Sequence, residues 1–181
     1  LGAARDEIAR KLDLIDPNTN SPVGSVPVGA GPAQVAVTAD GRFAYSGVSD
    51  PPKVVKVDLN KRKVVSSTEV PTPPVQLYLT SGEDVVLSAN QGTAETPGHT
   101  VSVIDTQTMT PRAVVKAGAG PHGVVIGDPA SRAWVTNTFE DTVSVIDLDE
   151  MSVSATIPVG HEPNGISYSP RSPAAAPAAT T

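Results

Sequence analysis

The sequence has no cysteine, few aromatic residues and few charged ones for its length. Without cysteine, disulfide bonds, thiolate metal sites and cysteine nucleophiles are excluded. Aromatic side chains make up 3% and charged side chains 18% of the 181 residues. No run of residues approaches the length of about 18 apolar side chains that spans a bilayer. We therefore expect no membrane insertion.

Basic residues are also scarce, and the net charge is −6 with a sequence pI near 4.9. Binding to nucleic acid or to anionic lipid needs clustered Lys and Arg. The longest basic run is Lys61-Arg62-Lys63, which is too short for such a patch and is typical of a solvated turn. We expect no nucleic-acid partner.

The abundant residues are Val, Ala, Thr, Pro and Gly, with 18 prolines and 15 glycines. β-Branched residues lose rotamer freedom in a helix, and Pro and Gly interrupt it. The same residues suit short strands joined by tight turns. The composition therefore predicts an all-β protein.

The two ends of the sequence differ from its middle. Residue 1 is Leu rather than Met, so we expect sequence to precede it, either a cleaved signal peptide or simply more of a longer chain. Residues 169–181 are rich in Pro, Ala and Thr and lack an apolar pattern, so we expect a flexible tail after a domain of residues 1–168. Such tails are familiar in exported proteins. We expect an extracytoplasmic location: secreted, periplasmic or on the cell surface.

Two landmarks repeat along the chain with identical spacings. An alternating apolar strand ends in an aspartate at four places, which are 42, 47 and 42 residues apart: Asp16, Asp58, Asp105 and Asp147. A proline opens the connection to the next repeat at the same spacings: Pro32, Pro74, Pro121 and Pro163. The period of about 42 residues, with four short strands in each unit, is that of a β-propeller blade.

Each full repeat predicts four strands, a to d. The first set comprises residues 35–37, 43–46, 54–58 and 64–70. The second comprises residues 77–79, 85–88, 101–105 and 113–116, and the third comprises residues 124–126, 133–136, 143–147 and 155–159. Strands c and d of an earlier blade precede them, and a last strand a is expected at Gly165–Ser169. No segment shows the 3.6-residue apolar period of a helix.

The repeats resemble the YVTN family of β-propeller proteins. The resemblance is carried by Trp134–Asn137 (WVTN), by the VSVID strand at 143–147 and by the ATIPVG segment at 155–160, and it covers roughly residues 8–168. It implies a propeller fold. Relatives occur in surface-layer and other exported proteins, and similar propellers carry haem or copper in respiratory enzymes together with modules that this chain lacks.

Two arrangements of about four blades fit the strand count. The last strand a could pair with the N-terminal strands and close a four-bladed ring without open edges. Alternatively, the chain is part of a larger propeller, because seven blades are usual for YVTN relatives. Open blade faces would then favour self-association.

The three histidines are predicted to lie on one face of the disk, where the d-to-a and b-to-c connections meet. His122 and His161 lie on d-to-a connections, and His99 lies on the b-to-c loop Gln91–Thr100, which holds the insertion. One interpretation is that they bind a metal or an anionic ligand with Glu95 or Glu162. The other is that all are exposed turn residues, because no HxxxH or H-x-E spacing supports a metal site.

Other polar residues are assigned structural roles. The four repeated aspartates are expected to accept backbone hydrogen bonds in turns. Asn90 and Asn137 end equivalent strands, where Asn can satisfy backbone groups, and Trp134 is expected in the core.

The predicted function is that of a non-enzymatic binding or scaffolding propeller without a cofactor, whose partner is a protein or a surface ligand. The face with the d-to-a and b-to-c loops would carry the contacts. The alternative is a metal-dependent, lactonase-like or redox-associated propeller enzyme fragment, which would need carboxylates with Asn or His converging on the axis.

Overall fold

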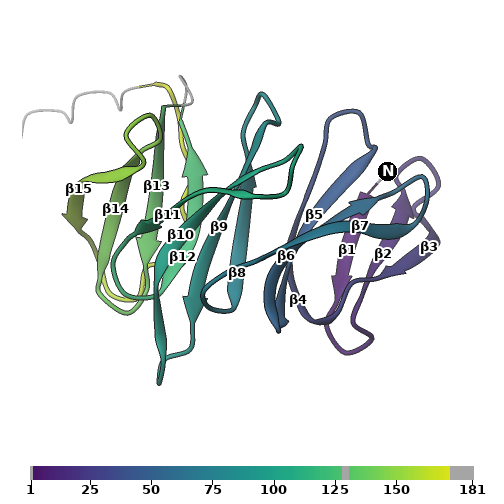
Figure 1. Cartoon of the computed structure of the whole chain (residues 1–181), viewed down its shortest axis with the longest axis horizontal. Helices are drawn as coiled ribbons and strands as arrows, with labels where there is room; N and C mark the ends of the chain where they lie inside the picture. The colour runs from purple at the N-terminus through teal and green to yellow at the C-terminus, as the bar shows by residue number, and fades with distance from the viewer. Residues whose placement is uncertain (1, 128–130, 172–181) are drawn as a thin grey trace, which may run out of the picture.

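The computed structural model describes residues 2–127 and 131–171, and these residues form an all-β protein. Fifteen strands are arranged in four antiparallel sheets that follow one another along the longest axis of the molecule (Figure 1). No helix occurs among the described residues, so none of them forms a helix that could cross a membrane. The predicted fold class is confirmed.

Each sheet is one propeller blade, with strands in sequence order. Blade 1 contains β1 (Gly2–Asp6), β2 (Lys11–Asp16) and β3 (Ser21–Pro27). Blade 2 contains β4 (Ala30–Val37), β5 (Phe43–Asp50), β6 (Pro52–Asp58) and β7 (Lys63–Glu69). Blade 3 contains β8 (Pro74–Leu79), β9 (Val85–Gly92), β10 (Pro97–Asp105) and β11 (Pro111–Lys116). Blade 4 contains β12 (Pro121–Ile126), β13 (Arg132–Asn137), β14 (Thr142–Asp147) and β15 (Ser152–Pro158).

The blades form an open arc. Blade 1 and blade 4 lie at opposite ends of the molecule in Figure 1, and β1 pairs with β2 alone among the described strands. The predicted last strand at Gly165–Ser169 is wrong, because the structure assigns no strand there. A strand needs a ladder partner, and no strand b lies beside this segment. The described residues therefore show the open arrangement and not a closed four-bladed ring.

Apolar side chains fill each of the three gaps between blades. Alternate residues of a strand point to opposite faces of its sheet, so each interior blade contributes to two gaps. On β5, Ala44 packs toward blade 1 and Tyr45 toward blade 3. On β9, Val86 packs toward blade 2 and Leu87 toward blade 4. The core is thus a series of layers between the sheets.

The repeated aspartates have the predicted role in the turns after strand c. The Asp16 carboxylate accepts the backbone N–H of Asn18 at 2.9 Å, and the Asp58 carboxylate accepts that of Lys61 at 2.9 Å. Asp105 and Asp147 accept two backbone N–H groups each at 2.8–3.0 Å. These bonds hold the turn in every blade, since short polar side chains can replace missing backbone partners.

The predicted roles of the two asparagines and of Trp134 are wrong in detail. Asn90 and Asn137 are buried, and their amide groups donate to side-chain hydroxyls, not to turn backbone. Trp134 is only partly buried, and its ring stacks on Tyr168 with centroids 5.3 Å apart. It packs on the face of blade 4 that points away from blade 3, where none of the described strands covers it.

Candidate functional site

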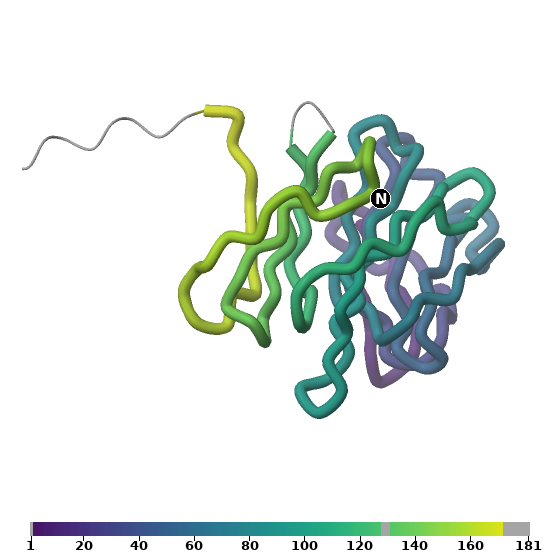
Figure 2. The backbone as a smooth tube through the Cα atoms, turned by 60° about the vertical axis from the view of Figure 1, so that its left-hand side comes forward, coloured from purple at the N-terminus to yellow at the C-terminus, as the bar shows by residue number. Residues whose placement is uncertain are grey.

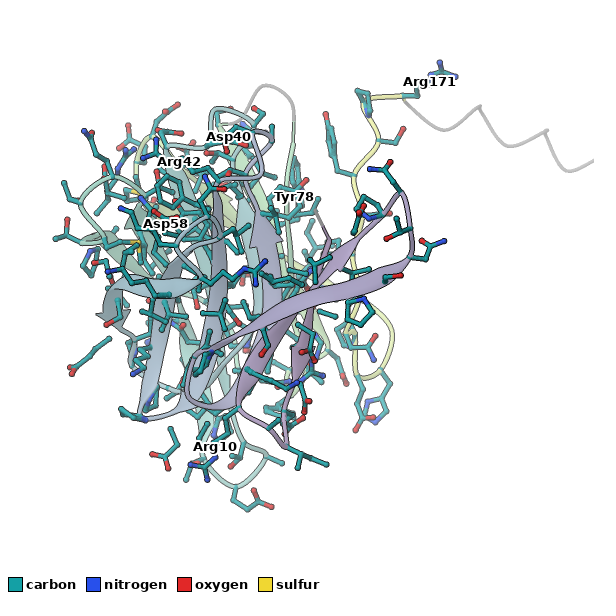
Figure 3. The ribbon with its side chains drawn as sticks, turned by 90° about the vertical axis from the view of Figure 1, so that its right-hand side faces the viewer. Arg10, Asp40, Arg42, Asp58, Tyr78 and Arg171 are labelled. Carbon is teal, nitrogen blue, oxygen red and sulfur yellow. The ribbon has the colours of Figure 1, made fainter. Side chains whose placement is uncertain are left out.

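The turns of the propeller gather at two opposite faces. In Figure 3, Arg10 in the b-to-c turn of blade 1 lies at one end, and Asp40 and Asp58 lie at the other. We call the end with the b-to-c and d-to-a connections the loop face. The β9–β10 hairpin projects from this face beyond the other turns, at the bottom of Figure 1 and of Figure 2. It contains the one insertion in the repeats.

The predicted loop Gln91–Thr100 is largely an extension of this hairpin. Strand β9 continues to Gly92 and β10 begins at Pro97, so that only residues 93–96 form the turn. The Thr96 amide and the Thr93 hydroxyl are 3.1 Å apart, which closes the tip. Glu95 is exposed there, and bonds from its own backbone amide and from Thr93 lower the pKa of its carboxyl. The hairpin is therefore an ordered projection.

His99 lies on β10 and is exposed beside a groove of about 540 Å³ between blades 3 and 4. The groove is lined by charged groups of both signs and by small side chains. Its lining residues are His99, Lys116, Ala117, Gly118, Ala119, Glu140, Ser144, Val153 and Thr156. Such a mixture of charge and apolar surface suits an extended polar chain more than a compact apolar ligand.

The d-to-a connection along this groove is held from both sides. Its Ala117 amide donates to the His99 carbonyl at 2.7 Å, and its Gly120 amide donates to the Gly98 carbonyl at 2.9 Å. The Ala119 amide donates to the Glu140 carboxylate at 2.6 Å. The hairpin and the neighbouring blade thus fix the backbone, which makes the groove a preformed feature.

His122 lies at a different place on the loop face. It is half-buried at the start of the inner strand β12, and its Nδ1 atom is buried without a hydrogen-bond partner. It borders a cavity of about 420 Å³ with Arg5, Glu7 and Gln34, on the inner side of the arc. The Arg5 guanidinium donates to the Pro32 carbonyl at 3.1 Å. Of the three histidines, this one lines the inner cavity.

His161 and Glu162 lie on the connection after blade 4. The His161 Nδ1 atom is 3.0 Å from the Asp141 carboxylate, and the Glu162 amide donates to the same carboxylate at 2.9 Å. The hydrogen bond to Asp141 raises the pKa of His161, and His161 in turn lowers the pKa of Asp141. This exposed pair fixes the connection by a charge-assisted bond.

The structure therefore places the predicted ligand-binding residues at separate points of one face. Within residues 2–127 and 131–171, no three His, Asp or Glu side chains come together in a group that could hold a metal ion. A ligand role for each histidine stays a prediction. The sequence analysis missed Lys116 and Glu140 in the groove, because they lie in different blades and follow no common pattern.

The row of antiparallel sheets and the turns gathered at two opposite faces define a β-propeller with one extended hairpin. A family description of YNCE-like β-propellers matches residues 23–173, and the chain belongs to this family. No match was found among curated proteins. The YVTN resemblance agrees with the propeller at the level of the fold.

Two solved structures have a similar fold. The chain is similar to Kuenenia stuttgartiensis hydrazine synthase, with 22% identity and a TM-score of 0.81 over 90% of this chain and 46% of that one. It is also similar to a functionally unknown protein from Desulfotomaculum acetoxidans, with 16% identity and a TM-score of 0.76 over 92% of this chain and 55% of the other. The chain thus spans about half the length of these proteins. At such identity, the likeness concerns the fold.

Proposed function

We propose that this protein is a binding propeller that holds an extended segment of a partner protein in the groove beside the β9–β10 hairpin. The observation that carries this proposal is the preformed groove on the loop face, with the projecting hairpin along one side. Function in propellers and other repeat folds concentrates in loops of one face, where insertions leave the blades undisturbed.

The groove offers several kinds of contact to a peptide. Lys116 and the exposed His99 can pair with acidic groups, and Glu140 with a basic group or a backbone amide. The small residues of the connection let a peptide backbone approach closely. The net charge of −6 disfavours nucleic acid as the partner. An exported location, suggested by the Pro/Ala/Thr-rich tail, remains part of the proposal.

The test uses a phage-displayed library of random dodecapeptides selected on the purified chain. Peptides that bind are then measured by calorimetry against His99→Ala/Lys116→Ala. We expect this variant to weaken binding about tenfold or more, which corresponds to about 1.4 kcal/mol. The matched control is Lys61→Ala/Lys63→Ala, which removes two exposed charges on the opposite face and should leave the affinity unchanged.

A library that yields no binders, or binders that distinguish the control variant but not the groove variant, would contradict the proposal. The second result would assign binding to the turns of the opposite face. Both variants change exposed side chains, so each is expected to fold like the wild type. Circular dichroism of each variant checks this.

A further inference from the structure

Blade 4 exposes an apolar face. In blades 2 and 3 the corresponding face is buried against the next blade. We call the side of a blade that points to the following blade its trailing face, and the other side its leading face. On blade 3, Val115 lies six residues before the connecting proline and is 3% exposed, because blade 4 covers it. On blade 4, Ile157 holds the same position and is 44% exposed. Val159 is 40% exposed, whereas Val70, at its position in blade 2, is 7% exposed.

Strand b shows the same difference. Tyr45 in blade 2 and Leu87 in blade 3 are buried in the gap to the next blade. Trp134 holds their position in blade 4 and is only partly covered, by the Tyr168 ring stacked on it. The trailing face of blade 4 is therefore built as an interblade surface, continuous with the three filled gaps.

The C-terminal segment 163–168 lies on this face where the inner strand of a following blade would lie. It runs beside blade 4 in Figure 2, and the Thr138 hydroxyl donates to the Pro163 carbonyl at 2.8 Å. It passes so close to β12 that a Cβ atom on Gly123 would be 2.9 Å from the Asn164 carbonyl oxygen. Ile166 follows its proline at the same distance as Leu77 and Val124, which are inner-strand residues. The segment therefore occupies the place of an inner strand, although the structure assigns no strand to it.

Blade 1 has the complementary deficit. Its strands correspond to b, c and d of the other blades, and the edge of β1 where an inner strand belongs has no partner among the described strands. An exposed strand edge is a template for pairing with another chain. The segment 163–168 and the edge of β1 could complete one four-stranded sheet.

The leading face of blade 1 repeats a polar arrangement that is buried in blades 3 and 4. In blade 4, the Asn137 amide donates to Thr142 and Ser144 hydroxyls, each at 2.9 Å. Blade 3 has the same arrangement of Asn90 with Thr100 and Ser102. These groups lie in the gap to the preceding blade, whose Gly118 amide reaches the Ser144 hydroxyl at 3.4 Å.

In blade 1, charged residues hold these three positions. The Lys11 ammonium lies 2.8 Å from the Asp13 carboxylate and 3.6 Å from that of Asp6. The three side chains are about one-third exposed, since no blade covers them. The Gly118 amide, which reaches Ser144, lies three residues before Pro121. Gly160 lies three residues before Pro163, so its amide corresponds to this donor. A blade packed here would supply a backbone N–H to the Asp13 carboxylate.

We propose that two copies of this chain associate head to tail, with the trailing face of blade 4 in each packed on the leading face of blade 1 in the other. Segment 163–168 of each copy takes the inner-strand place beside β1 of the second copy. Two copies supply eight blades, which is within the range of four to eight in which propellers close. In a closed pair, the trailing face of blade 4 and the leading face of blade 1 are both covered in each copy, so no further copy can add.

The first experiment measures the mass of the 181-residue chain by light scattering after gel filtration. The wild type is expected at twice the chain mass of 18.5 kDa at tens of micromolar. Ile157→Asp places a charge on the trailing face and should give the mass of one chain at the same concentration. The control Val114→Asp changes a residue of 48% exposure on the outer strand of blade 3, on the face opposite to that of Val115, and should leave the pair intact.

The second experiment uses the absence of cysteine. In blade 2 the inner strand pairs Ala36 with Tyr45, and the same register places Ser167 opposite Ala3. Ser167→Cys and Ala3→Cys are made as two separate single variants and mixed under mild oxidation. A disulfide that joins one variant to the other is expected, because cross-strand Cβ atoms lie within bonding reach. Ala4→Cys in place of Ala3→Cys points to the other side of the sheet and should not react.

Several outcomes would overturn the proposal. A wild type that stays at one chain mass, or that forms open-ended oligomers, excludes the closed pair. A pair that survives Ile157→Asp uses another surface. If a double variant, Ala3→Cys/Ser167→Cys, forms its disulfide within one chain while the mixed single variants do not react, the chain closes on itself as a four-bladed ring.

Discussion

At the scale of single residues, an aspartate holds the turn after strand c in each repeat. The aspartate there accepts backbone N–H groups that the turn leaves without partners. Asp105 carries the largest set, because the Arg112 guanidinium also donates to it at 2.8 and 3.1 Å. Arg112 reaches on to the Asp84 carboxylate at 3.2 Å and ties this turn to the a-to-b turn of the same blade.

These bonds make stability depend on pH. The backbone N–H of Thr108, and after it Arg112, hold the pKa of Asp105 well below its ordinary value of 3.8. A carboxyl with a lowered pKa in the folded state stabilises the fold above the pKa of the unfolded chain, and this contribution is lost as the pH falls through the folded pKa. Asp105→Asn should therefore lower the melting temperature at pH 7, and its difference from the wild type should shrink below about pH 3.

Melting curves by circular dichroism between pH 7 and pH 2 check this prediction. The control is Asp149→Asn, which removes an exposed carboxylate from the corresponding turn of blade 4. It should melt like the wild type across the range. A deficit of Asp105→Asn that stays constant down to pH 2 would show that the carboxylate charge contributes nothing.

At the scale of elements, the β9–β10 hairpin departs most from the repeat. Its extension passes close to Thr72 in the connection before blade 3. Gly98 packs against the Asn90 carbonyl and the Thr72 hydroxyl, and a Cβ atom there would overlap both. The Gly98 carbonyl also accepts the Gly120 amide, so the hairpin and the groove connection share this contact. A single glycine thus positions the hairpin against the groove.

Gly98→Ala should destabilise the protein by about 1–3 kcal/mol, because a methyl group here must displace backbone and not a flexible side chain. Urea unfolding measures the difference. The matched substitution Gly82→Ala places its Cβ atom 3.4 Å from the Asp84 carboxylate, an ordinary contact with a side chain, and should change stability by less than about 0.5 kcal/mol. Equal stabilities for the two variants would mean that the hairpin can shift away from Thr72 at little cost.

At the scale of the whole molecule, the arc has two unequal ends. The leading face of blade 1 carries an ion-paired polar cluster, and the trailing face of blade 4 carries exposed apolar side chains. In repeat proteins each unit is stabilised mainly by its neighbours, so a terminal blade gains most from a partner. Pairing of two copies would therefore stabilise blades 1 and 4 more than the two blades between them.

Association of this kind links melting to concentration. A tenfold rise in protein concentration should raise the melting temperature of the wild type by about 1–3 °C, since mass action favours the paired folded state. Ile157→Asp should melt at one temperature at all concentrations, and Val114→Asp should follow the wild type. Differential scanning calorimetry over two decades of concentration measures this. A wild type whose melting does not shift would contradict the pairing.

The sequence by itself determined the strands of the three full repeats, their grouping into blades and the role of the turn aspartates. These features depend on alternation within a strand and on hydrogen bonds between residues two or three apart, so they recur visibly with each repeat. The extent of the β9–β10 hairpin was only partly predicted. The insertion was visible in the sequence, but the continuation of β9 and β10 into it accompanies close contacts of Gly98 with the Asn90 carbonyl and the Thr72 hydroxyl.

Only the tertiary structure decided how the ends and faces relate. Whether residues 165–169 form a strand depends on a partner at the far end of the arc, and no local pattern encodes that distance. The separation of His99, His122 and His161 depends on how far each connection lies from the inner strands. Trp134 and Leu87 hold the same position in their blades. Leu87 is buried in the core because blade 4 packs on it, whereas Trp134 is only partly covered, since burial in a repeat fold depends on the neighbouring blade.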